Sequence, residues 1–221
     1  MFNTRLPHFR QRIGIMLLGN FFMGFFLSIL LDVDLGMDPY SCMIVGASGK
    51  VGLSFGTTIA IINCILLLPS LFRKRSLISF GSVVNMFLNG YVCDFFVWVW
   101  SRTLPEGFFG IPAIRWGGMV LATLGLCVSA AAYMASDTGV SPFDSLPFVI
   151  TDIFPRLPFT PVRIACDMTC VLAGFLLGAT LGPVTVIMAF CTGPFIRLIR
   201  NLIDKRFAAW DAAHPAAGAQ E

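Results

Sequence analysis

The chain has 221 residues, of which 57% are hydrophobic and only 12% are charged. Its mean hydropathy is +0.82. Because a soluble domain carries about 25% charged residues, this composition excludes an ordinary globular protein and predicts an all-α membrane protein. The net charge of +3 follows from the basic residues that set membrane topology, so it does not indicate nucleic-acid binding.

Six apolar stretches are long enough to span a membrane, since a helix crosses the roughly 30 Å hydrocarbon layer with about 20 residues. They are 13–33, 53–72, 77–100, 116–135, 162–177 and 181–199. The first follows arginines, as in a signal peptide, but no A-x-A cleavage site comes after it, so we expect an uncleaved helix. We expect a cytoplasmic tail over 1–12, a first three-helix unit over 13–101, an outer loop over 102–115, a second unit over 116–203 and a cytoplasmic tail over 204–221.

The orientation follows from the basic residues, which accumulate in short cytoplasmic loops. With six spans and an inner N-terminus, only Lys50, Arg102 and Arg115 of the 15 basic residues lie outside. An eight-span alternative gives the same ratio, but it would require 38–52 and 141–157 to cross. Both stretches are short and are interrupted by glycine, proline or charge. We therefore expect six spans with both termini in the cytoplasm.

The membrane-embedded part contains an internal repeat, with its two copies 103 positions apart. The sequence DLGMDPY at 34–40 returns as DTGVSPF at 137–143, and the same shift pairs Arg12 with Arg115. Chance similarity among apolar residues is the alternative interpretation. Because three spans per copy is an odd number, the second copy would enter the membrane from the opposite side. This predicts two inverted three-helix repeats, an architecture of transporters whose binding site lies where the repeats meet.

Each copy also predicts a short helix after its first span. Asp38-Pro39 and Ser141-Pro142 put a capping residue directly before proline, which is favoured at the first helical position. We expect the first of these helices to break near 46–49. A broken helix at membrane depth is tolerated only when it is buried in protein or lines a cavity. If both dip inward, their N-termini would favour an anionic or strongly polar group; alternatively each lies flat at its interface.

Ionisable side chains inside a span are costly and mark a cavity or a partner. Asp167 is the leading one, and Arg163, four residues earlier, shares its helical face. The two could hold a substrate charge, or Arg163 could snorkel to the inner boundary and simply neutralise Asp167. The polar groups of the short helices and of the second and third spans complete the candidates. The predicted substrate-binding residues are Asp38, Pro39, Asn63, Asn85, Ser141, Pro142, Asp144, Arg163 and Asp167.

Further polar residues lie on the third span and at its repeat equivalent. Asn85 and Asn89 share one helical face, where they could line a polar path or bond a neighbouring helix. Asp94, near the outer end of the third span, is equivalent to Arg197, near the inner end of the sixth. We expect these two on opposite membrane faces, without a pair between them, each as an interfacial anchor or a gate residue.

No pattern for catalysis occurs, which predicts that the protein is not an enzyme. H-E-x-x-H, G-x-S-x-G and the P-loop lysine pattern are missing, and the only histidines, His8 and His214, lie in the tails. The 7 cysteines lie in apolar surroundings and are interpreted as small hydrophobic side chains. We therefore expect no metal and no cofactor.

The motifs GMDP at 36–39, GLSFG at 52–56 and GVSPFD at 139–144 resemble the YitT/YczE family of bacterial integral membrane proteins. The resemblance extends over residues 10–200. It implies a multi-pass protein of the bacterial inner membrane with a permease role, and it offers little on the substrate.

Together these observations predict a small inverted-repeat permease for a small polar solute, with an anion among the options. The expected partners are the lipid bilayer and a solute of unassigned identity, with a homodimer left open. The alternative is a non-transporting accessory or regulatory membrane protein. A continuous polar cavity would favour transport, and a dry interior would favour the accessory role.

Overall fold

The structure is a computed structural model that describes residues 9–188, 198, 201–202 and 205–206, and the described part contains helices and no strand. Five helices are long and apolar enough to cross a membrane. They are α1 (Phe9–Val33), α3 (Phe55–Arg73), α4 (Phe80–Thr103), α5 (Pro112–Ala135) and α7 (Phe159–Leu176). The predicted all-α membrane class is confirmed. The sixth predicted span, 181–199, lies largely outside the described residues.

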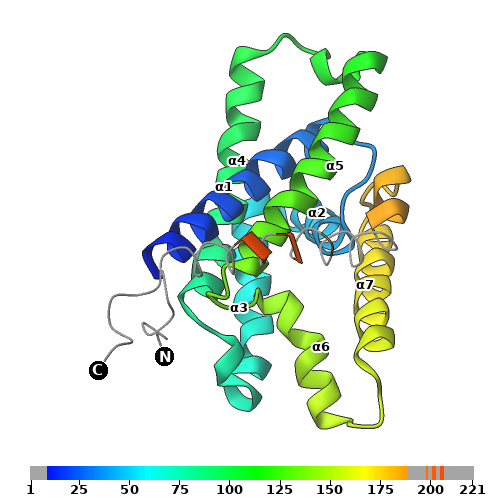
Figure 1. The fold of residues 1–221 in the computed structure, drawn as a ribbon. Helices are drawn as coiled ribbons and strands as arrows, with labels where there is room; N and C mark the ends of the chain where they lie inside the picture. Colours follow the sequence, from blue (N-terminus) through cyan, green and yellow to red (C-terminus); the bar gives the residue numbers. More distant parts are fainter. Residues whose placement is uncertain (1–8, 189–197, 199–200, 203–204, 207–221) are drawn as a thin grey trace.

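Short elements connect these long helices. The helices α2 (Pro39–Val51) and α6 (Pro142–Ile153) follow α1 and α5, and the 3-10 turns η1 (Arg75–Leu77) and η2 (Phe108–Gly110) precede α4 and α5. As Figure 1 shows, α1 crosses the middle of the molecule beside α5. The same helix packs against α4, while α3 packs against α4 and α6, and α2 packs against α7.

The core forms where α1, α4 and α5 meet. Leu27, Leu30 and Val33 of α1 pack in one buried cluster with Leu126 of α5. Large apolar side chains also point outward along the long helices, and Phe72 is 85% exposed. Such a continuous apolar exterior is expected of helices that face lipid.

One polar contact bridges α1 and α4 inside this core. The buried Asn85 side chain donates from Nδ2 to Oδ1 of Asn20 at 2.5 Å. Asn20 in turn donates to the Met16 carbonyl at 2.8 Å. The bonding of a neighbouring helix, one of the two roles considered for Asn85, is therefore confirmed. Asn20 is not one of the predicted site residues.

The two short helices start as their capping sequences predict. Pro39 and Pro142 occupy the first helical positions of α2 and α6, and both are buried. Asp38 and Ser141 are the N-cap residues, each with extended backbone and a side-chain oxygen that accepts a backbone N–H. This arrangement satisfies one of the amide groups that a helix start leaves unpaired.

The predicted break of α2 near 46–49 is wrong. The helix continues to Val51 and ends at Gly52, whose φ of 72° lies in the left-handed region. A Cβ at Gly46 would come within 2.9 Å of the Gly174 carbonyl oxygen of α7. Glycine therefore serves close helix packing at position 46, not a helix end.

The turns that lead into α2 and α6 have matching backbones. Asp34 and Asp137 have φ values of 50° and 52°, and Gly36 and Gly139 have φ values of 90° and 126°. Each pair is separated by 103 positions. Glycine adopts positive φ without steric cost, so both motif glycines fit the turns that they form.

Several long-range contacts occur twice, the second time between the repeat equivalents of the first two residues, 103 positions away. Arg12 donates to Asp137 Oδ2 at 3.2 Å, and Arg115 donates to the Asp34 carbonyl at 2.9 Å. In the backbone, two further hydrogen bonds show the same relation. These are Val184 N to Leu35 O at 3.3 Å and Gly81 N to Thr138 O at 3.0 Å.

Candidate functional site

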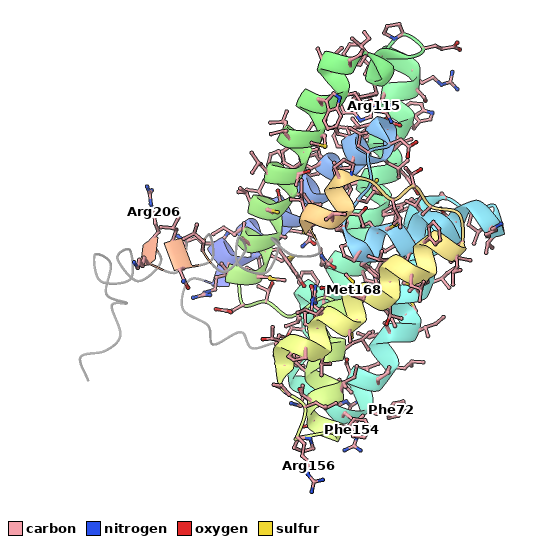
Figure 2. The ribbon with its side chains drawn as sticks, turned by 90° about the vertical axis from the view of Figure 1, so that its right-hand side faces the viewer. Phe72, Arg115, Phe154, Arg156, Met168 and Arg206 are labelled. Atoms are coloured by element: carbon pink, nitrogen blue, oxygen red, sulfur yellow. The ribbon has the colours of Figure 1, made fainter. Side chains whose placement is uncertain are left out.

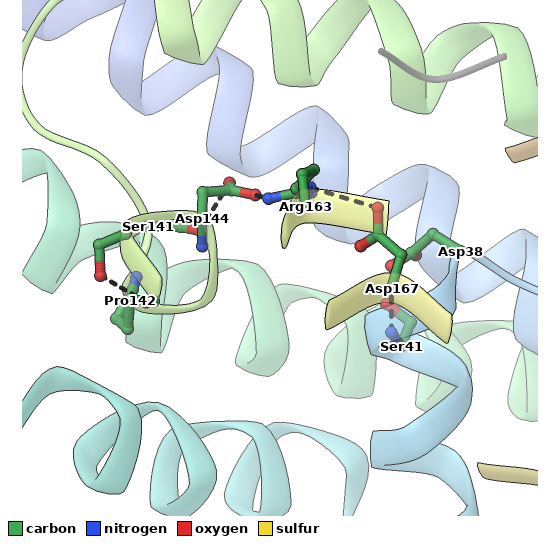
Figure 3. Close-up of polar contacts among 8 residues, drawn as sticks. Asp38, Ser41, Ser141, Pro142, Asp144, Arg163 and Asp167 are labelled. Carbon is green, nitrogen blue, oxygen red and sulfur yellow. Dashed lines mark hydrogen bonds and ion pairs between the residues drawn. The ribbon is translucent and has the colours of Figure 1, made fainter. Parts of the chain in front are cut away.

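A charged cluster lies where α6 meets α7. Arg163 donates from Nη1 to Asp144 Oδ1 at 2.5 Å and from Nε to Asp167 Oδ2 at 3.2 Å (Figure 3). The three side chains are 30%, 18% and 16% exposed in this order. The predicted contact between Arg163 and Asp167 is confirmed, and the arginine bridges two carboxylates instead of one.

An acidic side chain lies at the start of each short helix, Asp38 as the N-cap residue of α2 and Asp144 in the first turn of α6. Asp38 Oδ2 accepts the Ser41 N–H at 3.0 Å. Ser141 accepts the Asp144 N–H at 3.2 Å and donates its hydroxyl to Asp144 Oδ2 at 2.7 Å. The first motif thus has a carboxylate at the N-cap and a hydroxyl three residues later, and the second motif has the reverse order. Each positive helix end already faces a carboxylate of the chain itself, a favourable placement for a negative charge.

Two aromatic rings join the starts of α2 and α6. The rings of Tyr40 and Phe143 stack with centroids 4.5 Å apart and an interplanar angle of 11°. Tyr40 donates its hydroxyl to Asn63 Oδ1 at 2.7 Å. On the other side, Cζ of Arg163 lies 5.0 Å from the centre of the Phe143 ring, within the range of a cation–π contact. The site is therefore both charged and aromatic.

Negative charge exceeds positive charge in this cluster. Asp38 interacts electrostatically with Asp144 and with Asp167. Within the described part of the chain, Arg163 is the only basic side chain that forms ion pairs with these acids. With all four groups ionised, three negative charges face one positive charge.

A buried tyrosine lies near the acidic groups. Tyr133 of α5 is only 2% exposed, and its hydroxyl has no hydrogen-bond partner among the described residues. The hydroxyl interacts electrostatically with Asp144. Sequence reasoning missed Tyr133 because its repeat equivalent is the apolar Leu30, so the repeat gave no polar signal at this position.

The other predicted residues lie apart from the cluster or touch it indirectly. Asn63 reaches it only through Tyr40, and Asn85 lies in the α1–α4 contact. Asp94 accepts the Gly56 N–H at 2.9 Å, so it caps the first turn of α3. Arg197 lies outside the described residues.

A small cavity lies beside the turn between α1 and α2. Its volume is about 50 Å³, and Leu30, Met37, Cys42 and Val45 are among the residues that line it. Ligand sites for small molecules usually measure about 300–1,000 Å³. The cavity is therefore too small for a metabolite.

A family model described as a family of unknown function (DUF6198) matches residues 10–201. The chain belongs to the DUF6198 family. Among its relatives, "Uncharacterized protein YyaS" of Bacillus subtilis is 26% identical, over 82% of this chain and 88% of the relative. "Uncharacterized membrane protein YczE" of the same organism is 26% identical, over 82% of this chain and 85% of the relative. An "Uncharacterized protein" of Haemophilus influenzae is 23% identical, over 88% and 86%.

The predicted resemblance of this DUF6198 protein to YczE is confirmed, while the resemblance to YitT stays a prediction. The description of YczE as a membrane protein agrees with the apolar helices and supports a membrane location. No solved structure matches the chain.

Proposed function

We propose that this DUF6198 protein is a small permease for a polar solute, built from six spans in two inverted three-helix repeats. The observation that carries the proposal is the Asp144–Arg163–Asp167 cluster at the meeting point of two short, proline-started helices. Charged groups within membrane spans commonly mark substrate or ion pathways. Broken helices that meet between repeats are typical of transporter binding sites.

The reciprocal contacts support a two-fold relation between the repeats. Under a two-fold axis, a contact of Arg12 with Asp137 must return as one of Arg115 with the region of Asp34, and it does. A residue at the axis must contact its own equivalent, as Tyr40 contacts Phe143. Because these contacts join the start of each long helix to the end of the other, α1 and α5 are antiparallel. This favours an axis in the membrane plane, and hence inversion.

The six-span topology, with both termini inside a bacterial inner membrane, is compatible with two ion pairs of the structure. Under the six-span topology, Arg12 and Asp137 both lie inside, and so do Lys74 and Asp152, which form an ion pair at 3.2 Å. Arg115 lies outside. Figure 2 shows Arg115 toward one end of the molecule and Arg156 at the other.

The two ion pairs of Arg163 would allow it to release one carboxylate partner to a solute. A charge at the centre of a span costs about 2.5–3.5 kcal/mol on insertion scales when it is left alone. Because Arg163 is shared by two carboxylates, it can release one while it keeps the other. A solute could enter at the released carboxylate without leaving Arg163 unpaired. Of the solutes that the sequence left open, an anion is disfavoured, because Asp38 and Asp144 already lie at the two helix starts.

The test is a thermal-shift screen of the purified protein against neutral, cationic and anionic metabolites, followed by uptake into proteoliposomes. A ligand at 100 times its dissociation constant stabilises the folded state by about 2.7 kcal/mol. We expect Asp144→Asn to lose both the shift and the uptake. The control is Asp152→Asn, which removes an ion pair outside the cluster. Uptake by Asp144→Asn equal to that of the unaltered protein would contradict the proposal.

A second candidate function, a non-transporting accessory protein, is favoured by the small size of the cavity, about 50 Å³. Its signature would be a well-folded protein in proteoliposomes that gives neither ligand shift nor uptake with any member of the panel.

A further inference from the structure

We propose that the solute is a small organic cation, whose ammonium or guanidinium head takes over one of the two carboxylates, Asp144 or Asp167, that Arg163 bridges. This inference rests on the proposed permease function and names the substrate class of the same site. Asp38 supplies the additional carboxylate, and the Tyr40–Phe143 stack supplies the aromatic face.

The contacts of Arg163 outline what the site recognises. Its guanidinium group meets a carboxylate on each side, at Asp144 and Asp167, and the ring of Phe143 at 5.0 Å. Carboxylates that accept N–H donors, together with an aromatic face, form a suitable environment for a planar or ammonium cation. The chain's own arginine therefore occupies the place of a ligand head group.

The cluster holds three carboxyl groups and one basic group, which suits a further cation. Among the described residues, Asp38 has no ion-pair partner, although it interacts electrostatically with Asp144 and Asp167. Asp38 is stabilised by the Ser41 N–H at the start of α2, but a carboxylate away from water gains further from a nearby cation. A cationic solute supplies this interaction, and an anionic one opposes it.

Tyr133 provides a second, independent pointer to a ligand. Its hydroxyl is buried, has no hydrogen-bond partner among the described residues, and lies within electrostatic range of Asp144. A buried hydroxyl without a partner costs free energy that a bound polar group can recover. A solute with a polar atom beside its cationic head would bond to Tyr133.

The arrangement suits an organic cation better than a bare metal ion. In the described residues, no three acidic, cysteine or histidine side chains converge closely enough to hold a metal ion. Asp144 and Asp167 instead each bond to a different nitrogen of the flat guanidinium group of Arg163. An ammonium or guanidinium group bonds through its own N–H donors and needs no such tight coordination shell.

The experiment measures binding of methylguanidinium and ethylammonium chloride to the purified full-length protein by thermal unfolding. Potassium chloride controls for ionic strength, and sodium acetate is the anion probe. We expect saturable stabilisation by one or both organic cations and none by acetate. Asp38→Asn should raise the dissociation constant about tenfold or more. Asparagine also caps helices well, so this variant should fold. Asp152→Asn is the control and should bind as the unaltered protein does.

A second variant tests the displacement of Arg163. Arg163→Gln removes the internal competitor, so methylguanidinium should bind about tenfold more tightly and raise the melting temperature of the variant. If Arg163→Gln does not fold, Asp38→Asn decides alone. Stabilisation by acetate without either cation, or an unchanged dissociation constant in Asp38→Asn, overturns the inference. Cation binding without uptake supports the inferred cation site and contradicts the proposed permease function. Uptake of only neutral or anionic solutes supports the permease and overturns the inference.

Discussion

At the scale of single residues, the motif glycines combine two constraints. Gly36 and Gly139 have positive φ, and a Cβ at either position would come within 2.6 Å of a hydroxyl oxygen, of Thr185 and Ser82 respectively. The positive φ is needed to turn the chain from a long helix into a short one. The close approach lets the turn pack against a segment far along the chain.

Replacing these glycines with alanine separates the two constraints. Gly36→Ala and Gly139→Ala should each destabilise the protein by about 1–3 kcal/mol for the backbone, with a further cost for the clash. Gly107 has a φ of 78° but open space around its Cβ position, so Gly107→Ala should show the backbone cost alone. Gly110→Ala should be tolerated. Thermal unfolding of the four variants in detergent measures the differences. If Gly36→Ala lost no more stability than Gly107→Ala, close packing would have no part in the role of the motif.

At the scale of elements, an arginine side chain forms hydrogen bonds between α1 and α5 at each end of the pair. Arg12 donates to the Ser136 carbonyl at 3.4 Å, just beyond the end of α5. Arg115 donates to the Val33 carbonyl at 2.9 Å, at the end of α1. Carbonyl groups at a helix C-terminus lack intrahelical partners and carry partial negative charge, so a guanidinium group is favourable there.

Removing either arginine should weaken the pair. Arg12→Gln and Arg115→Gln should each lower the free energy of unfolding by about 1 kcal/mol. The two sites are separated by roughly the length of a 24-residue helix, about 36 Å, so their effects should add in the double variant. Arg156→Gln, an exposed arginine in the loop after α6, is the control and should change little. Reversible unfolding in mixed detergent micelles measures the difference. A double variant no weaker than either single one would show that only one end matters.

Local patterns predicted part of these elements and of the site. The four-residue spacing predicted the Arg163–Asp167 contact, and the capping residues predicted the starts of α2 and α6. The Asp144–Arg163 contact escaped prediction because it depends on how α6 and α7 pack, which no helical period encodes. The continuation of α2 through Gly46 escaped because a glycine for close packing and a glycine for a helix end look alike in sequence.

At the scale of the whole molecule, the two halves differ in charge while their backbones correspond. The repeat equivalents of Asp144 and Arg163 are Ser41 and, with one insertion allowed, Ile59. The Asp144–Arg163–Asp167 ion pairs belong to the second half, while Tyr40 of the first half stacks on Phe143 of the second. Under the proposed permease function, an asymmetric site in a symmetric frame would give a bound solute one defined orientation.

The relation between the halves and the membrane can be tested with two equivalent residues. Asp34 and Asp137 are both exposed and 103 positions apart. In a background whose native cysteines are replaced by serine, Asp34→Cys should react with a membrane-impermeant maleimide in intact cells. Asp137→Cys should react only after the membrane is permeabilised. Inverted repeats put equivalent residues on opposite faces, whereas an axis along the membrane normal would put them on the same face. Labelling of both cysteines in intact cells would therefore exclude inversion, and the six-span topology with it.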